Sequence, residues 1–293
     1  MSQKKKNVHK NLIVGGAGIN GSYYLGALWN LEEKGYLTEI ETYVGSSVGS
    51  VISLLMIIGY SPKIIQEVVV KLDLRGIFEN INSDDVLNFI DSFGICDPRI
   101  LMKIIFTFLK KANVESNVTF QQLFNQYKKK LFVTGTCLNT HSIHLFSVES
   151  HPTMKVLDAI RISISIPFVF SPVKFENSLY IDGAYLQCCY IDEIHSTNSI
   201  VLDNFTTTPC ISSFPSLSLW SYSLTVIQSF MMHQYHILKD DILSKIDKET
   251  SMYISIPVEC DKFSVDFSAS EESKIEMFED GYKIVNQIYG EYS

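Results

Sequence analysis

The sequence contains no long apolar run. Its most apolar stretch, residues 51–58, is far shorter than the ~20 residues that a transmembrane helix needs. The N-terminus carries lysines but neither the apolar segment nor the small-residue cleavage site of a secretory signal peptide. We therefore expect a soluble, cytoplasmic protein, or one delivered by a route that the sequence does not declare.

Basic charge is also scarce. The 293 residues include 24 Lys and Arg against 32 Asp and Glu, a net charge of −8. This balance argues against nucleic acid as the main partner and provides no general attraction to anionic membranes. The Lys4-Lys5-Lys6 run is local, so we expect residues 1–10 to be a disordered, solvated tail. Residues 11–293 are expected to form a single domain, because no repeat or linker divides them.

The six cysteines include no C-x-x-C pair, which makes reduced core residues the simplest interpretation. Cys188 and Cys189 lie near His195, but this spacing is poor for a metal site. We therefore predict no metal.

Two glycine-rich turns near the N-terminus stand out. Each follows a short apolar run, residues 12–14 and 41–44, and residues 22–34 between them have helical spacing with Gly35 at the expected helix end. A strand, a helix and a strand form a right-handed βαβ unit with parallel strands. Both turns then open at the same carboxyl edge of the sheet.

The second turn, Gly45-Ser46-Ser47-Val48-Gly49, has the G-x-S-x-G spacing of a nucleophile elbow. Alone it could be an ordinary tight turn in which Ser47 caps the next helix. Its place between a strand and an apolar helix, expected at residues 48–60, favours a nucleophilic serine. The amides of the first turn would then face Ser47 across one small volume.

The first turn, Gly16-Ala17-Gly18-Ile19-Asn20-Gly21, also matches the G-x-G-x-x-G pattern of dinucleotide-binding proteins. That function requires an acidic residue at the end of the second strand, where this sequence instead has the serine turn. NAD(P) binding therefore ranks as the third hypothesis.

A nucleophilic serine needs a base. His195, His233 and His236 are available for a Ser-His-Asp site, but none lies in a recognisable motif. Asp182-Gly183-Ala184 offers a carboxylate, although an isolated Asp-Gly pair is a common hairpin signal.

The rest of the chain alternates between helical and extended patterns. The residues from 73 to 118 predict two or three short helices, at 86–89 and 99–111, which could form a lid or pack on the sheet. We expect further helices at 62–72, 119–127, 154–164, 216–239 and 271–289, and extended segments at 131–138, 143–148, 173–181, 199–202 and 252–256.

Taken in order, the three motifs resemble those of the patatin-like phospholipases: G-G-G-x-R/K-G, G-x-S-x-G and D-G-G/A. Residues 25–28 and 159–167 resemble the family's flanking segments, and the likeness covers residues 11–192. It implies a three-layer α/β/α fold with a mostly parallel central sheet. It also implies a Ser-Asp dyad of Ser47 and Asp182, without histidine.

The resemblance further assigns the oxyanion hole to the amides of Gly16, Ala17 and Gly18. The residues that would support the motifs are Gly15, Asn20, Gly21, Gly45, Gly49 and Gly183. The implied activity is that of a phospholipase A-type serine acyl hydrolase acting on membrane lipids, peripheral at membranes, with no metal or cofactor and with a protein activator left open. An ordinary aspartate, with a pKa of ~3.9, is a poor base for serine, so the site must depend on desolvation and on the oxyanion hole.

Two departures from the family pattern, Asn20 in place of Arg or Lys and Ala17 in place of a glycine, imply a weaker or specialised activity. The missing cation motivates an alternative, a catalytically weak or silent lipid-binding protein on the same fold. Residues 187–190 replace the family's Asn-Asn-Phe/Leu-Pro, a departure that concerns the neighbouring loop and not the dyad. We also expect exposed apolar residues of the helical region, including Phe106 and Phe108, to insert into a bilayer.

Overall fold

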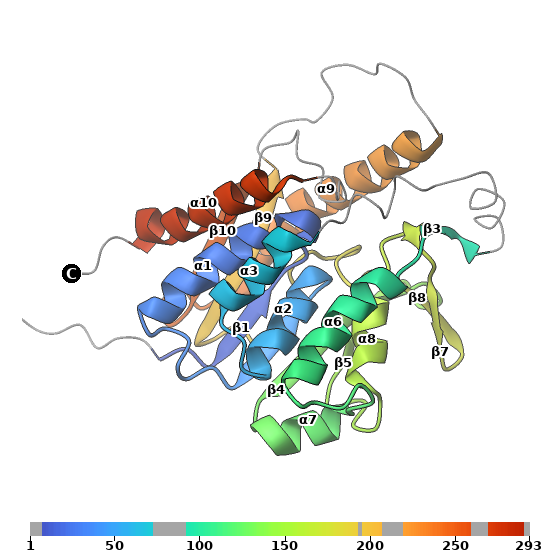
Figure 1. The fold of residues 1–293 in the computed structure, drawn as a ribbon. Coiled ribbons are helices and arrows are strands. Elements are labelled where there is room, and N and C mark those ends of the chain that lie inside the picture. The colour runs from blue at the N-terminus through green and yellow to red at the C-terminus, as the bar shows by residue number, and fades with distance from the viewer. Residues whose placement is uncertain (1–7, 73–91, 193–194, 207–218, 259–268, 290–293) are drawn as a thin grey trace, which may run out of the picture.

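The computed structural model describes residues 8–72, 92–192, 195–206, 219–258 and 269–289. Within these residues, an eight-stranded sheet forms the centre of the molecule, with the order β10-β9-β1-β2-β4-β8-β7 and with β5 also paired to β4 (Figure 1). The parallel strands are β10 (Met252–Val258), β9 (Ser199–Thr206), β1 (Asn11–Val14), β2 (Thr42–Gly45) and β4 (Lys130–Cys137).

One edge of the sheet is antiparallel. Both β5 (Ser142–Phe146) and β8 (Ser178–Ile181) run antiparallel to β4, and β7 (Val173–Phe175) runs antiparallel to β8. A separate small sheet pairs β3 (Gly94–Cys96) with β6 (Phe168–Phe170) in parallel.

Helices cover both faces of the central sheet. On one face the core includes residues of α1 (Gly21–Glu33), α2 (Val48–Ile57), α3 (Pro62–Lys71), α6 (Arg99–Lys111), α7 (Phe120–Tyr127), α8 (Val156–Ser163) and α10 (Glu271–Tyr289). On the other face, α9 (Leu219–Lys245) and the residue after it contribute Ile242 and Ile246. The predicted three-layer, mostly parallel fold is confirmed.

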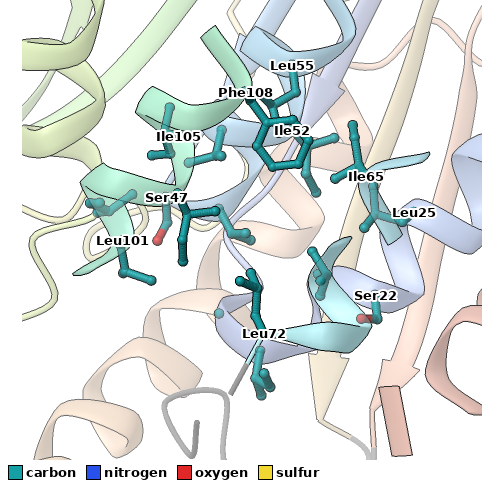
Figure 2. Close-up of a pocket in the computed structure, with 18 of the residues that line it drawn as sticks. Ser22, Leu25, Ser47, Ile52, Leu55, Ile65, Leu72, Leu101, Ile105 and Phe108 are labelled. Atoms are coloured by element: carbon teal, nitrogen blue, oxygen red, sulfur yellow. The ribbon is translucent and has the colours of Figure 1, made fainter. Parts of the chain in front are cut away.

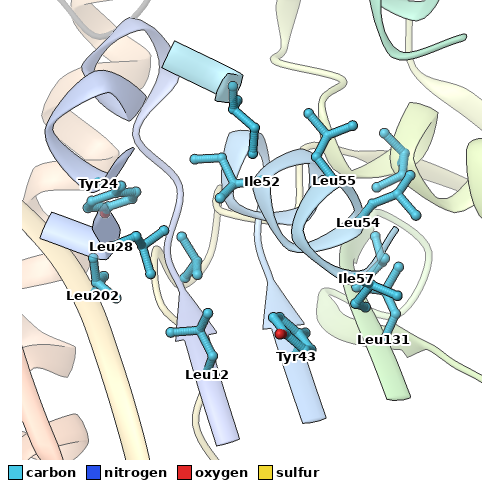
Figure 3. Close-up of a cluster of buried hydrophobic side chains, with 14 of the residues drawn as sticks. Leu12, Tyr24, Leu28, Tyr43, Ile52, Leu54, Leu55, Ile57, Leu131 and Leu202 are labelled. Carbon is cyan, nitrogen blue, oxygen red and sulfur yellow. The ribbon is translucent and has the colours of Figure 1, made fainter. Parts of the chain in front are cut away.

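The parallel strands are apolar on both sides because both of their faces are buried. Leu12 and Val14 face the multi-helix layer, whereas Ile13 between them faces the layer of α9. Figure 3 shows Leu12 and Tyr43 beneath side chains of α1 and α2. Each fully buried large apolar side chain stabilises the fold by about 1.5–3 kcal/mol relative to an exposed one.

The predicted βαβ unit is present and positions the two glycine turns. β1 and β2 pair in parallel with Val14 opposite Gly45, and α1 connects them. Both strands therefore end at the same edge, and the turns at Gly15 and Ser46 leave the sheet side by side. Gly35 ends the α1 region with a φ of 69°, as its helix-terminal position predicts.

Other elements differ from the sequence-based expectation. The single extended segment at 173–181 is a hairpin of β7 and β8 that turns at Glu176, whose φ is 50°. β3 and β6 have three residues each, too few to show a periodic pattern. The expected helix at 86–89 lies outside the described residues, as do residues 1–7. At residues 8–10, His9 is buried and the Lys10 N–H donates to the Asn198 carbonyl.

In the described part of the chain, no helix combines the length and the apolar character that crossing a membrane demands. Four of the six cysteines fall in this part, and none of these four forms a disulfide. The other two, Cys210 and Cys260, lie outside the described residues.

Candidate active site

Ser47 occupies a strained turn between β2 and α2. Its φ of 51° and ψ of −126° place a side-chain-bearing residue in a region that favours glycine. The flanking glycines make this turn sterically feasible. A Cβ atom at Gly49 would lie 2.2 Å from the Val14 carbonyl oxygen, and one at Gly45 would lie 2.3 Å from the Ser50 Cα. The G-x-S-x-G spacing is therefore a packing requirement of this turn.

The hydroxyl of Ser47 donates a hydrogen bond of 2.7 Å to Oδ2 of Asp182. Both residues are almost completely buried, with 6% and 3% of their surface exposed. The Ala184 N–H donates to the other carboxylate oxygen, Oδ1, at 2.7 Å. Because Oδ1 accepts the Ala184 N–H, Oδ2 remains available for the serine proton. The two hydrogen bonds together orient the carboxylate towards Ser47.

Asp182 reaches the site because β8 pairs with the C-terminal half of β4, two strands away from β1. The following glycine allows a close approach between them. A Cβ at Gly183 would lie 2.1 Å from Thr134 Oγ1 of β4. The D-G-A motif thus brings the Asp182 carboxylate close to β4. This strand is the neighbour of β2, and Ser47 follows the end of β2.

Burial raises the pKa of the Asp182 carboxyl to about 7, although hydrogen bonds from Ser47 and the Ala184 N–H act in the opposite direction. A general base works best when its pKa is near the operating pH. The poor match between an ordinary aspartate and a serine hydroxyl is thus reduced by desolvation.

The glycine loop after β1 lies directly over this pair. A Cβ at Gly16 would lie 2.4 Å from that of Ala184 and 3.5 Å from that of Ser47. The Gly16 N–H donates to the Cys188 carbonyl at 2.9 Å, so this amide is already engaged. Within the described residues, the N–H groups of Ala17 and Gly18 have no hydrogen-bond acceptor.

Val48 is a further candidate donor that the sequence analysis did not include. It is the first residue of α2, and the first N–H groups of a helix have no intrahelical partner. Its position directly after the serine was the available signal, because the residue after a nucleophile elbow commonly contributes to an oxyanion hole. Gly21 packs against it, since a Cβ there would lie 3.3 Å from Val48 Cγ2.

Asn20, which replaces the family's cation, is buried at the end of the short helix η1 (Gly18–Asn20). Within the described residues its side-chain oxygen has no hydrogen-bond partner. Gly15 anchors the start of the loop, since its N–H donates to the Leu202 carbonyl of β9 at 3.0 Å.

The histidines do not join Ser47. His195 is buried on the α9 side of the sheet, where its Nδ1 lies 2.6 Å from Asp192 Oδ1 and its ring packs edge-on against Phe132. His233 is exposed on α9, and the His236 side chain lies outside the described part of the structure.

The two adjacent cysteines have separate surroundings. The Cys188 thiol donates to the Gly16 carbonyl at 3.0 Å, whereas Cys189 is buried in the apolar cluster of Ile13 and Val44.

The end of α8 holds both members of the pair, which sequence reasoning missed. The hydroxyl of Ser163 accepts the Ser47 N–H at 2.9 Å, and its carbonyl accepts the Gly183 N–H at 3.0 Å. The carbonyl of Ser165 accepts the Asp182 N–H at 2.9 Å. The family resemblance at residues 159–167 indicated that this segment matters, but it did not assign a role to Ser163 or Ser165.

An apolar cavity of about 150 Å³ lies beside Ser47 (Figure 2). Residues of α1, α2, α3 and α6 line it together with the segment after α8, and Ser47 and Ser22 supply the hydroxyl groups in an otherwise apolar lining.

Phe108 lines this cavity, is buried, and packs edge-on against Tyr60. The prediction that Phe108 inserts into a bilayer is therefore wrong, while Phe106 is 44% exposed.

The model of one protein family, described as patatin-like phospholipase, matches residues 12–206. The chain belongs to this family. The chain is 31% identical over 181 residues to the probable lipid hydrolase 463L of Invertebrate iridescent virus 6, a match that covers 61% of each protein. It is also 28% identical over 291 residues to the uncharacterized protein R571 of Acanthamoeba polyphaga mimivirus, covering 95% of this chain and 93% of that protein.

Solved structures share the fold of this patatin-like chain. VipD from Legionella pneumophila aligns with a TM-score of 0.60 at 15% identity, over 96% of this chain and 66% of VipD. The type III effector ExoU of Pseudomonas aeruginosa aligns with a TM-score of 0.51 at 14% identity, over 95% of this chain and 52% of ExoU. The patatin-like chain thus spans less than two thirds of the length of VipD, of ExoU and of the iridescent virus protein.

Proposed function

We propose that this patatin-like protein is a lipid acyl hydrolase of the phospholipase A type, with Ser47 as nucleophile and Asp182 as base. The observation that carries the proposal is the 2.7 Å hydrogen bond from Ser47 Oγ to Asp182 Oδ2, made in a nucleophile elbow that borders an apolar cavity. Family membership and the similarity to a probable lipid hydrolase support the same class of reaction.

In the acylation step, Ser47 Oγ attacks the carbonyl carbon of the lipid ester while its proton passes to Asp182. The carbonyl oxygen becomes an oxyanion, which accepts hydrogen bonds from the N–H groups of Ala17, Gly18 and Val48. One such donor is typically worth ~10²–10³ in rate. The positive end of the α2 dipole lies at the same point and favours the same charge.

Collapse of this intermediate breaks the ester C–O bond. The proton on Asp182 then passes to the leaving oxygen, which departs as a lysolipid alcohol, and the fatty acyl group remains on Ser47. Water attacks the acyl-enzyme with Asp182 again accepting a proton, and fatty acid leaves as Ser47 regains its hydrogen. No step of this sequence requires a metal or a cofactor.

The cavity suits the acyl chain of such a substrate. Its walls are aliphatic and aromatic side chains, and it begins at the nucleophile, so an acyl chain can lie in it while its ester carbonyl meets Ser47. Because lipids with two long chains reside in bilayers, we infer that the enzyme works while bound peripherally to a membrane.

Fatty acid release from mixed phospholipid vesicles tests the proposal. Wild type should release fatty acid, whereas Ser47→Ala and Asp182→Asn should release none while keeping the far-UV circular dichroism of the wild type. Full activity in either variant contradicts the assigned dyad.

The alternative, a silent lipid-binding protein, is favoured by the buried Asn20 in place of a cation. A fluorophosphonate probe separates the two hypotheses, because labelling that depends on Ser47 requires a competent nucleophile. Saturable NAD(P) binding would instead support the nucleotide hypothesis.

A further inference from the structure

Helix α6 has two chemically different faces. Its inner side contributes Leu101, Ile104, Ile105 and Phe108 to the lining of the cavity beside Ser47. At 100° per residue, Arg99, Lys103, Phe106 and Lys110 fall on the opposite side, and Ile100, Thr107 and Lys111 flank it. We define the α6 outer face as the exposed residues of this helix: Arg99, Ile100, Lys103, Phe106, Thr107, Lys110 and Lys111.

The α6 outer face is basic in an acidic protein. The helix carries four basic residues and no acidic one, whereas the whole chain has a net charge of −8. Arg99 pairs with Asp97 at 2.7 Å. Among the described residues, Lys103, Lys110 and Lys111 form no ion pair, and all three side chains are exposed.

Apolar side chains accompany these lysines. Phe106 is 44% exposed and lies one turn from both Lys103 and Lys110, and Ile100, which is 39% exposed, lies one turn before Lys103. Figure 1 shows α6 next to α2 in the helical layer that covers one face of the sheet. Basic residues with exposed aromatic and aliphatic groups on a helix are typical of segments that bind at the headgroup region of a bilayer.

We propose that the α6 outer face docks onto a bilayer containing anionic phospholipids. The lysine ammonium groups contact the headgroup phosphates and carboxylates, while Phe106 and Ile100 enter the boundary between headgroups and acyl chains. The proposal rests on the proposed function for its choice of a lipid surface over an acidic protein. The same helix separates this surface from the cavity, so an acyl chain leaving the bilayer has only one helix to pass before it reaches Ser47.

Co-sedimentation with vesicles tests the docking surface, using Ser47→Ala so that lipid is not consumed. We expect strong binding to vesicles of phosphatidylcholine with 30% phosphatidylserine and weak binding to pure phosphatidylcholine. Each lysine at an anionic surface changes partitioning about fivefold. Lys103→Gln/Lys110→Gln/Lys111→Gln in the same background should therefore lower partitioning by about 100-fold, and Phe106→Ser should weaken binding further.

The matched control is Lys155→Gln/Lys174→Gln/Lys248→Gln, which removes the same charge from exposed lysines outside α6. It should bind almost like its parent. Equal losses in the two triple variants would show a net-charge effect and overturn the proposal. Wild-type binding by the α6 variant, or no vesicle binding by Ser47→Ala itself, would also overturn it and leave an acidic protein as the candidate partner.

Hydrolysis of a soluble ester distinguishes failure of the docking proposal from failure of the proposed function. With Ser47 intact, the α6 triple variant should hydrolyse p-nitrophenyl butyrate at the wild-type rate. Loss of vesicle binding with retained hydrolysis supports docking through α6. Absence of hydrolysis in the wild type would count against the acyl hydrolase alone, since vesicle binding by the Ser47→Ala chain is measured separately.

Discussion

The backbone N–H of Ser47 donates a hydrogen bond of 2.9 Å to the hydroxyl of Ser163, which lies 116 positions later in the chain. Ser47 has a strained backbone, and such a conformation persists only when its surroundings hold it in place. Because the carbonyl of Ser163 also holds the Gly183 N–H, the same residue positions Ser47 and the segment carrying Asp182.

Ser163→Ala should slow acylation. It leaves the buried Ser47 N–H without an acceptor, a loss of about 1–3 kcal/mol. Because this N–H holds the reactive turn, the loss should lower kcat by roughly 5- to 150-fold. Ser163→Thr keeps the hydroxyl and should restore most of the rate. The measurement is kcat and KM on a soluble ester, together with the rate of fluorophosphonate labelling.

A matched control for this substitution is Ser53→Ala on α2. The Ser53 hydroxyl is buried and has no hydrogen-bond partner within the described residues, so its removal should leave kcat unchanged. If Ser163→Ala altered only the unfolding midpoint and not the labelling rate, Ser163 would be structural rather than positioning.

Hydrolysis should depend on pH through Asp182. Only the carboxylate can accept the Ser47 proton, and burial raises the pKa of this group to about 7. The kcat/KM for a soluble ester should therefore rise from pH 5 to pH 8 and level off above that. A profile already flat at pH 5 would indicate an aspartate with an ordinary pKa and would contradict the role of burial.

Asp203 should make the fold less stable as the pH rises. It is fully buried on β9, accepts the Tyr253 hydroxyl at 2.8 Å, and burial raises its pKa to about 6. Between the unfolded pKa of ~3.9 and this value, the folded state binds more protons than the unfolded state, so the free energy of unfolding falls with increasing pH.

Asp203→Asn removes this titration. The variant should gain stability relative to wild type between pH 4 and pH 7, as measured by urea unfolding at both values. Asp182 contributes a slope of the same sign and remains in both proteins, so the difference between the two isolates Asp203. An unchanged difference across this range would show that Asp203 does not titrate there.

The far end of the cavity should limit acyl-chain length. Figure 2 shows Leu55 next to Phe108 and away from Ser47. Leu55→Phe should fill this end, lower kcat/KM for long-chain esters at least tenfold, and leave butyrate esters nearly unaffected. Both measurements use p-nitrophenyl esters of increasing chain length.

Leu54→Phe supplies the comparison. Leu54 is also buried on α2 but does not line the cavity, so it reproduces the overpacking cost of about 1–3 kcal/mol without filling the cavity. A similar change in chain-length preference in both variants would argue against the cavity as the acyl site.

The sequence by itself determined the architecture around the two turns. Apolar periodicity and glycine spacing act over a few residues, so strand, helix and strand could be predicted around Gly16 and Ser47 from local patterns alone. The order of three motifs suggested that Asp182 is the partner of Ser47, and the structure brings their side chains to 2.7 Å across 135 positions.

Tertiary structure decided the properties that depend on residues distant in the sequence, namely the orientation of amides and side chains and the pKa of Asp182. The Gly16 amide is turned to Cys188, and Ser163 supports the elbow, because β1, β2 and α8 end at the same edge of the sheet. Phe108 points into the cavity and Phe106 outward because helix rotation relative to α2 is set by packing. The pKa of Asp182 likewise follows from burial by several layers, since desolvation depends on all the groups that surround a charge and not on its neighbours in sequence.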